Sequence, residues 1–178
     1  MRAHSEFGKL ISLFLKKASA SFIDDMHISQ HWEALNYLGK PDIAKALQEY
    51  DAFEQILKDH GAEVLYFPPN DNVNMDSIYC RDAAIATSKG MIICNMGKEG
   101  RINEPAAQER AFESNGIPVL GVIAAPGTLE GGDVAWLDDK TLAVGHTYRT
   151  NEEGIRQLSA LLAPLGVSVL PVAMPHYK

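Results

Sequence analysis

The chain has 178 residues, a formal net charge of −7 and two cysteines. Its length suits a single domain with a sizeable core, and it has no Lys/Arg-rich run of the kind that binds nucleic acid or anionic membranes. No apolar stretch reaches the roughly 18 residues of a membrane helix, and two cysteines cannot form a disulfide framework. We therefore expect a soluble cytoplasmic α/β domain that binds neither nucleic acid nor membrane.

The first part of the chain predicts two strands separated by a helix. Hydrophobic periodicity gives a strand at 9–15, an irregular or helical insertion at 18–40, an amphipathic helix at 42–60, a strand at 62–67 and a loop at 68–72.

The rest of the chain repeats the order strand, strand, helix, strand. The first copy is expected at 78–87, 91–96, 102–115 and 117–123, and the second at 133–137, 141–146, 151–165 and 167–172. A period of about 50 residues, with Asp82 and Asp133 in corresponding places, indicates a repeat architecture such as a propeller. We treat residues 1–178 as one domain with blade-like units at about 8–70, 76–123 and 128–172.

Two acids occur in "DSIYCRD", residues 76–82. If this segment is a strand, alternation places Asp76, Cys80 and Asp82 on one side and Arg81 on the other. Two carboxylates side by side would suit a guanidinium ligand, whose N–H groups carboxylates accept in pairs. In the alternative interpretation, Asp82 caps a turn and Asp76 is solvated in a loop.

A second acidic motif is "EGGD", in which Glu130 and Asp133 flank two glycines. Paired glycines let the backbone pass close to a ligand or another strand, so Glu130 could be set rigidly into a pocket. The alternative is a glycine turn with solvated acids. The motif is not a phosphate loop, because no following Lys-Ser/Thr or spaced third glycine occurs.

Arg101 and Arg149 stand at equivalent places, each just before the helix of its repeat. In a propeller such positions converge on the axis, where two arginines could bind one carboxylate; separately, each could be a surface charge. His27 and His31 have the i, i+4 spacing of metal ligands and Glu33 is nearby, but no third ligand has persuasive spacing, so we expect a solvated or partly packed helix face and no metal site. We expect no cofactor.

Together, "DSIYCRD" (76–82), "EGGD" (130–133) and "GHTYRTNEEG" (145–154) resemble the guanidine-modifying pentein superfamily, in particular dimethylarginine dimethylaminohydrolases and amidinotransferase-like proteins. The resemblance implies an α/β propeller of five ββαβ blades, of which about three are present. It implies hydrolysis or transfer at the guanidinium group of arginine or a derivative, using a cysteine nucleophile and a histidine acid/base.

Specific roles follow from the resemblance. Asp76 and Asp82 would bind the guanidinium, Glu130 would act in catalysis by orienting the histidine, and Arg101 with Arg149 would bind the α-carboxylate. Arg81 stands where some hydrolases of the family have an acid, which leaves the exact substrate open.

The sequence departs from the family pattern at the catalytic pair. The family's histidine and cysteine lie beyond the position of Lys178, and His176 comes too early to be that histidine. We therefore expect this chain alone to be inactive, as the N-terminal three-fifths of such an enzyme would be.

Two alternatives remain open. In one, Cys80 is the nucleophile and His146 its base. In the other, the chain is a non-catalytic binding or assembly module of the same fold, whose open strand edges favour a homo-oligomer.

Overall fold

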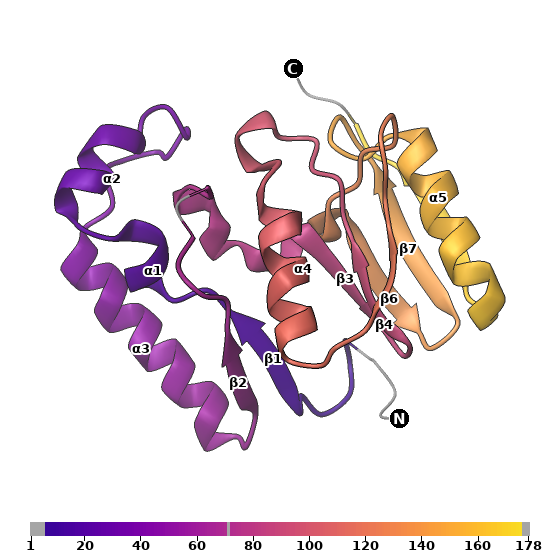
Figure 1. Ribbon diagram of the computed structural model, residues 1–178, viewed down its shortest axis with the longest axis horizontal. Coiled ribbons are helices and arrows are strands. Elements are labelled where there is room, and N and C mark those ends of the chain that lie inside the picture. Colours follow the sequence, from indigo (N-terminus) through magenta and orange to yellow (C-terminus); the bar gives the residue numbers. More distant parts are fainter. Residues whose placement is uncertain (1–5, 71, 176–178) are drawn as a thin grey trace. The chain divides into compact units, whose positions relative to one another are not determined.

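The computed structural model describes residues 6–70 and 72–175, which form two compact units (Figure 1). One unit contains residues 9–70 and 72–80, and the other contains 81–175 together with 6–8. Both combine strands with helices, as expected. His176 lies outside the described residues. No helix within the described ranges has both the length and the apolar character needed to cross a membrane.

The unit of residues 9–80 has a parallel strand pair connected by helices. The strands are β1 (Ser12–Leu15) and β2 (Glu63–Tyr66); the helices between them are α1 (Ala18–Phe22), α2 (Asp25–His31) and α3 (Ile43–Asp59). Parallel neighbours require such a crossover, because the chain must return to the same end of the sheet. Asp24 and Asp42 cap α2 and α3 by accepting hydrogen bonds from backbone N–H groups of the first turn.

The core of this unit lies between its helices and the segment after β2. Its buried apolar residues are Ala18, Phe22, Ile28 and Met75. The insertion expected at 18–40 is thus partly helical, and it supplies three of these four core residues.

The second unit contains the repeated ββαβ order that the hydrophobic pattern predicted. The first copy consists of β3 (Ala84–Thr87), β4 (Gly90–Ile93), α4 (Glu104–Ser114) and β5 (Val119–Val122); the second consists of β6 (Val134–Asp138), β7 (Thr141–His146), α5 (Glu152–Leu162) and β8 (Ser168–Ala173). In each copy the first two strands are antiparallel, and the third pairs in parallel with the second after the helical crossover.

Both copies contribute to one hydrophobic core. Its fully buried members include Ile92 and Ile123 from the first copy, and Leu142, Val144 and Leu158 from the second. A core shared in this way fixes the segments that precede β3 and β6 relative to each other, and these segments carry Asp82 and Glu130.

The strand expected at 78–87 begins only at Ala84, which corrects the arrangement proposed for the first acidic motif. Residues Met75–Ile78 and Cys80–Ala83 form two short 3-10 helices. Side chains do not alternate along a 3-10 helix, so the placement of Asp76, Cys80 and Asp82 on one strand face was wrong. Asn74 begins the first of these helices by accepting a hydrogen bond from the Asp76 N–H.

Candidate functional site

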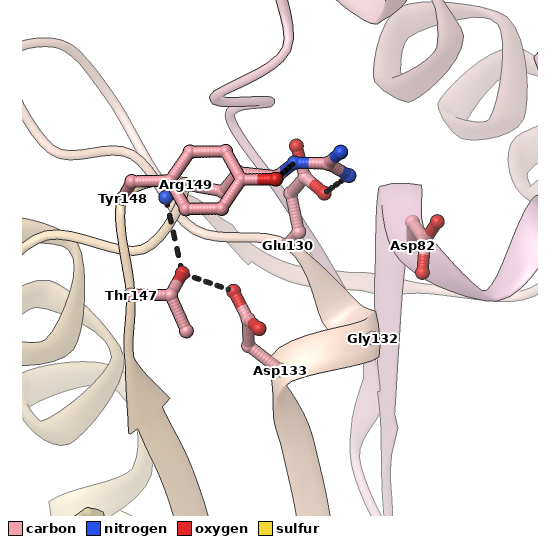
Figure 2. Close-up of a pocket in the computed structure, with 7 residues that line it drawn as sticks. All are labelled: Asp82, Glu130, Gly132, Asp133, Thr147, Tyr148 and Arg149. Atoms are coloured by element: carbon pink, nitrogen blue, oxygen red, sulfur yellow. Dashed lines mark hydrogen bonds and ion pairs between the residues drawn. The ribbon is translucent and has the colours of Figure 1, made fainter. Parts of the chain in front are cut away.

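A pocket of about 360 Å³ lies in the repeat unit (Figure 2). It is lined by Asp82, Glu130, Gly132, Asp133, Thr147, Tyr148 and Arg149. These residues come from two equivalent loops and from the β7–α5 connection. The pocket therefore brings together three of the predicted site residues, Asp82, Glu130 and Arg149.

Paired glycines let the two acidic loops approach each other. A Cβ on Gly131 would lie 2.4 Å from the Arg81 carbonyl oxygen, and one on Gly132 would lie 2.3 Å from Oδ1 of Asp82. Both distances are shorter than real Cβ contacts. A larger residue at Gly131 would meet backbone and force the loops apart, whereas one at Gly132 would displace the Asp82 side chain. This confirms the prediction that "EGGD" permits a close backbone approach.

Glu130 is buried, with only 3% of its surface exposed. One carboxylate oxygen accepts a hydrogen bond from the Lys98 N–H and the other accepts one from Nη1 of Arg149, both at 3.1 Å. Its own N–H donates to the Thr150 hydroxyl at 3.1 Å. The alternative that Glu130 is a solvated turn residue is therefore wrong, because the side chain is held rigidly inside the pocket wall.

Arg149 lies in the connection between β7 and α5, with about a third of its side chain exposed. Its Nε donates to the Tyr148 hydroxyl at 3.1 Å, and its guanidinium lies over the Tyr148 ring. Partial burial by itself would lower the pKa of Arg149, but the hydrogen bond and charge of Glu130 outweigh that effect and raise it. Arg149 therefore stays cationic at the pocket.

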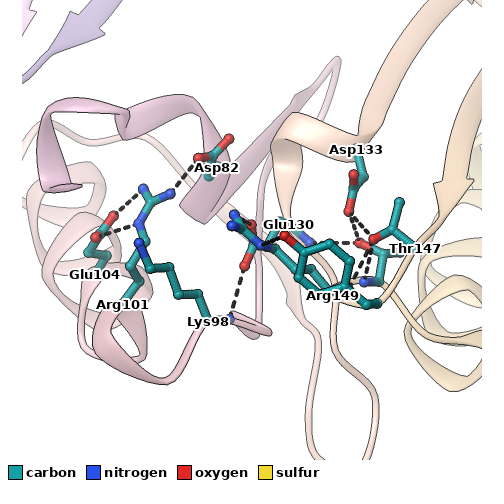
Figure 3. Close-up of polar contacts among 10 residues, drawn as sticks. Asp82, Lys98, Arg101, Glu104, Glu130, Asp133, Thr147 and Arg149 are labelled. Atoms are coloured by element: carbon teal, nitrogen blue, oxygen red, sulfur yellow. Dashed lines mark hydrogen bonds and ion pairs between the residues drawn. The ribbon is translucent and has the colours of Figure 1, made fainter. Parts of the chain in front are cut away.

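Arg101 takes a different position, beside the pocket and almost fully buried (Figure 3). It donates through Nε and Nη2 to the two carboxylate oxygens of Glu104, each at 2.7 Å, and through Nη1 to Asp82 at 2.5 Å. Burial opposes its charge, yet Glu104 and Asp82 raise the pKa of Arg101 above its ordinary value. The alternative that Arg101 is a surface charge is wrong, and its binding of a substrate carboxylate stays a prediction.

Asp133 organises the loop that carries Arg149. Its Oδ2 accepts hydrogen bonds from the hydroxyls of Thr147, at 2.9 Å, and Thr150, at 2.5 Å. The Thr147 hydroxyl in turn accepts the N–H groups of Arg149 and Thr150. This network ties the acidic loop before β6 to the loop after β7.

Several residues with structural roles in the site were not assigned one from the sequence: Glu104, Asp133, Thr147 and Thr150. Glu104 follows Arg101 by three positions, the spacing at which helical side chains meet, and this signal could have found it. The threonines carry no comparable signal, because their partner Asp133 precedes them by an entire hairpin.

Asp76 belongs to the other unit, where only 4% of it is exposed. Burial raises the pKa of Tyr37 in the same unit, and the nearby Tyr79 and Asp76 raise it further, so the Asp76 carboxylate lies close to that phenol. The alternative of a solvated loop residue is wrong for Asp76, whereas its guanidinium-binding role stays a prediction.

Neither cysteine lines this pocket. Cys94 is 2% exposed, and burial raises the pKa of its thiol, which disfavours the thiolate needed for nucleophilic attack. Cys80 is partly exposed, and its thiol lies 3.7 Å from the Phe14 carbonyl oxygen in the unit of residues 9–80. The proposal that Cys80 acts with His146 as base stays a prediction.

The His27 and His31 rings lie side by side, with centroids 4.5 Å apart. Within residues 6–70 and 72–175, no group of three or more His, Cys, Asp or Glu side chains is arranged to hold a metal ion.

The chemistry of this pocket follows from its charges. Three carboxylates and one guanidinium face a small volume, so the acids can accept N–H donors from a cation while Arg149 can bind an anion. A ligand that carries both a guanidinium or ammonium group and a carboxylate would complement it.

Comparisons with known proteins agree with a guanidinium-containing ligand. Residues 20–174 match the family model described as N,N dimethylarginine dimethylhydrolase, eukaryotic. An N(G),N(G)-dimethylarginine dimethylaminohydrolase of Streptomyces coelicolor is 40% identical over 139 residues, and one of Pseudomonas aeruginosa is 35% identical over 133 residues. These matches cover 78% and 75% of this chain, respectively, and the chain spans 52% of the length of each relative.

A solved structure of the Pseudomonas aeruginosa enzyme, a cysteine-to-serine mutant complexed with citrulline, is similar in fold. It matches with a TM-score of 0.78 and 28% identity, covering 94% of this chain and 62% of that chain. Because the family model matches most of the length of this chain, the chain belongs to the dimethylarginine dimethylaminohydrolase family.

Proposed function

We propose that the chain provides the guanidino-binding part of an enzyme that modifies arginine or N-methylated arginines. The observation that carries this proposal is the convergence of Asp82, Glu130 and Arg149 on one pocket. The activity for which the family is named, hydrolysis of dimethylarginine, and the citrulline bound to a structural relative support the ligand class.

The predicted site residues have distinct parts in the proposal. Asp82 and Glu130 accept N–H groups of the ligand's guanidinium, and Glu130 also orients the catalytic histidine that the family uses. Arg149 binds the ligand's carboxylate. Asp76, which belongs to the unit of residues 9–80, is proposed as a further guanidinium-binding acid. The contacts of Arg101 with Glu104 and Asp82 favour a role in holding Asp82 over direct binding of the substrate.

The existing pair of Glu130 and Arg149 supports this assignment chemically. Glu130 already accepts one guanidinium N–H at 3.1 Å, and a ligand guanidinium would compete for the same carboxylate. Arg149 would then turn toward the ligand's carboxylate, exchanging one ion pair for two.

The reaction is cleavage of a C–N bond at the guanidinium carbon by hydrolysis, or transfer of the amidino group. In the chemistry that the family resemblance implies, both use a thiolate nucleophile and a proton donor. The seven pocket-lining residues include no cysteine and no histidine. We therefore propose that this chain binds the ligand but does not turn it over by itself.

We further propose that the two ββαβ copies are neighbouring blades of a pentein-type propeller. The strands β1 and β2, with their helices, contribute to a third blade, so that about three of five blades are present. The identical pairing order of the sheets β3–β4–β5 and β6–β7–β8 supports the repeat.

Titration with L-arginine, followed by amide NMR of the 178-residue chain, tests the binding. We expect shifts concentrated at the loops of Asp82, Glu130 and Arg149, and affinity reduced by about tenfold or more in Glu130→Gln. Asp139→Asn, at an exposed turn, serves as the control. Absence of amide shifts at the pocket at millimolar arginine would overturn the proposed binding. Ready citrulline production would overturn the proposal that the chain does not turn over the ligand by itself.

One observation favours a second candidate, a non-catalytic assembly module. The outer strands β5 and β8 carry exposed apolar side chains, with Val122 at 50%, Leu170 at 49% and Val172 at 41% exposure. Such surfaces favour association with another copy. Size-exclusion chromatography with light scattering separates the two candidates, because a monomer that binds arginine at low micromolar chain concentration would exclude obligatory assembly.

A further inference from the structure

The buried pair of Arg101 and Glu104 lies directly behind Asp82 in the pocket wall (Figure 3). Arg101 is 3% exposed and Glu104 is 1% exposed. A buried charge is retained only when it is well paired, and here both carboxylate oxygens of Glu104 accept guanidinium N–H groups at 2.7 Å. Glu104 also lies in the first turn of α4, where the helix dipole favours an acid.

This geometry leaves Arg101 little freedom. Two parallel hydrogen bonds fix the plane of a guanidinium, and the helix fixes the carboxylate that accepts them. The remaining nitrogen, Nη1, then points to Oδ2 of Asp82 at 2.5 Å. Asp82 is partly exposed to the pocket, and the Arg101 guanidinium donates to its carboxylate. The orientation of Asp82 therefore depends on Arg101, which Glu104 holds in place.

Charge gives a second reason for the arrangement. Glu104 and Asp82 both pair with Arg101, and the negative charge of Glu104 offsets part of the positive field that Arg101 exerts on Asp82. Without the charge of Glu104, the positive field of Arg101 would fall on Asp82 and oppose an incoming cation.

We propose that Glu104 is a positioning residue: acting through Arg101, it orients Asp82 and preserves the attraction of the pocket for a guanidinium. This inference rests on the proposed guanidino-binding function. The cation selectivity of the pocket then depends on a residue that does not line it.

Glu104→Gln tests the inference, because it keeps the shape of the side chain and removes its charge. The affinities for L-arginine and for L-citrulline, whose urea group is uncharged, are compared by NMR titration. We expect arginine binding to weaken about tenfold and citrulline binding less than twofold. A merely structural role would weaken both ligands alike, and this result, or no change for either, would overturn the inference.

The matched control is Glu153→Gln. Glu153 and Arg156 form another bidentate pair at i, i+3, with both distances 2.7 Å, but on the exposed surface of α5. We expect this variant to bind both ligands like the parent chain. A change as large as that of Glu104→Gln would trace the effect to net charge and overturn the inference.

A measurement without ligand separates this inference from the proposed function. In the parent chain the Arg101 Nε–H should exchange slowly with solvent, and Glu104→Gln should speed that exchange and shift the Asp82 carboxyl carbon signal. If neither ligand binds the parent chain, the proposed function fails, and these signals still decide the positioning role. Fast exchange in the parent chain, or an unmoved Asp82 signal, would refute it. Should Glu104→Gln not fold, Glu104→Asp, which keeps the charge but shortens the reach to Arg101, should still speed the Arg101 exchange and move the Asp82 signal.

Discussion

Glu130 and Arg149 form an ion pair across the pocket, with 3.1 Å between Oε2 and Nη1, although they lie 19 positions apart in the chain. Glu130 precedes β6, and Arg149 follows β7. The hairpin between them therefore returns the arginine to the acid, and the pair closes the open end of that hairpin.

We expect this pair to contribute about 1 kcal/mol to stability, because Glu130 is buried while solvent screens the partly exposed Arg149. A double-mutant cycle of Glu130→Gln and Arg149→Gln, measured by urea denaturation, gives the coupling energy directly. A coupling energy indistinguishable from zero would mean that the pair orders the pocket without stabilising the fold.

Asp133 should contribute more to the free energy of unfolding than its partial exposure suggests. Asp133→Asn weakens the acceptor of two hydroxyl groups, one of them on the fully buried Thr150, so we expect a loss of about 1–3 kcal/mol. Urea denaturation measures the loss, with Asp139→Asn as the exposed control. Thr150→Val breaks the same network, so the double variant should lose less than the sum of the single variants.

The sequence predicted the ββαβ repeat well, because each of its elements has its own local signal. Asn151 illustrates this: it begins α5 as predicted, and its side chain accepts the N–H of Gly154. Alternating apolar residues likewise identified β7 at its observed bounds, Thr141–His146.

The site was less predictable because its contacts join distant segments. Asp82 was expected on a strand, but Cys80–Ala83 is a 3-10 helix. The position of this short helix depends on Arg81. Arg81 donates to the carbonyl groups of Gly131 and Val134, at the start of the next repeat. No local pattern around residue 82 reports these partners.

Gly154 is a point of close contact between α5 and the loop before the second acidic motif. A Cβ at this position would lie 2.1 Å from the backbone oxygen of Thr128, which cannot move aside like a side chain. We expect Gly154→Ala to destabilise the chain by about 1–3 kcal/mol, despite the better helix propensity of alanine. Gly39→Ala is the matched control, since its Cβ would meet nothing within 4 Å; equal melting temperatures of the two variants would contradict the prediction.

The two cysteines should differ in reactivity toward iodoacetamide. Cys94 is 2% exposed with a raised thiol pKa, whereas Cys80 is partly exposed. Mass spectrometry of the native chain at pH 8 should find alkylation at Cys80 and almost none at Cys94, and both should react in urea. Preferential labelling of Cys94 under native conditions would show that the shared core opens readily.

The surface pair of Glu153 and Arg156 predicts a specific pH dependence. Hydrogen bonds from Arg156 and then Gln157 lower the pKa of Glu153 from 4.5 to about 2. Because the folded-state pKa lies below the unfolded value, this stabilisation is fully present above pH 4.5 and is lost as the pH falls from there through about 2. NMR titration of the Glu153 carboxyl carbon should give a midpoint well below 4 that rises toward 4.5 in Arg156→Gln and at high salt. A midpoint that does not respond to Arg156→Gln would mean that the pair does not persist in solution.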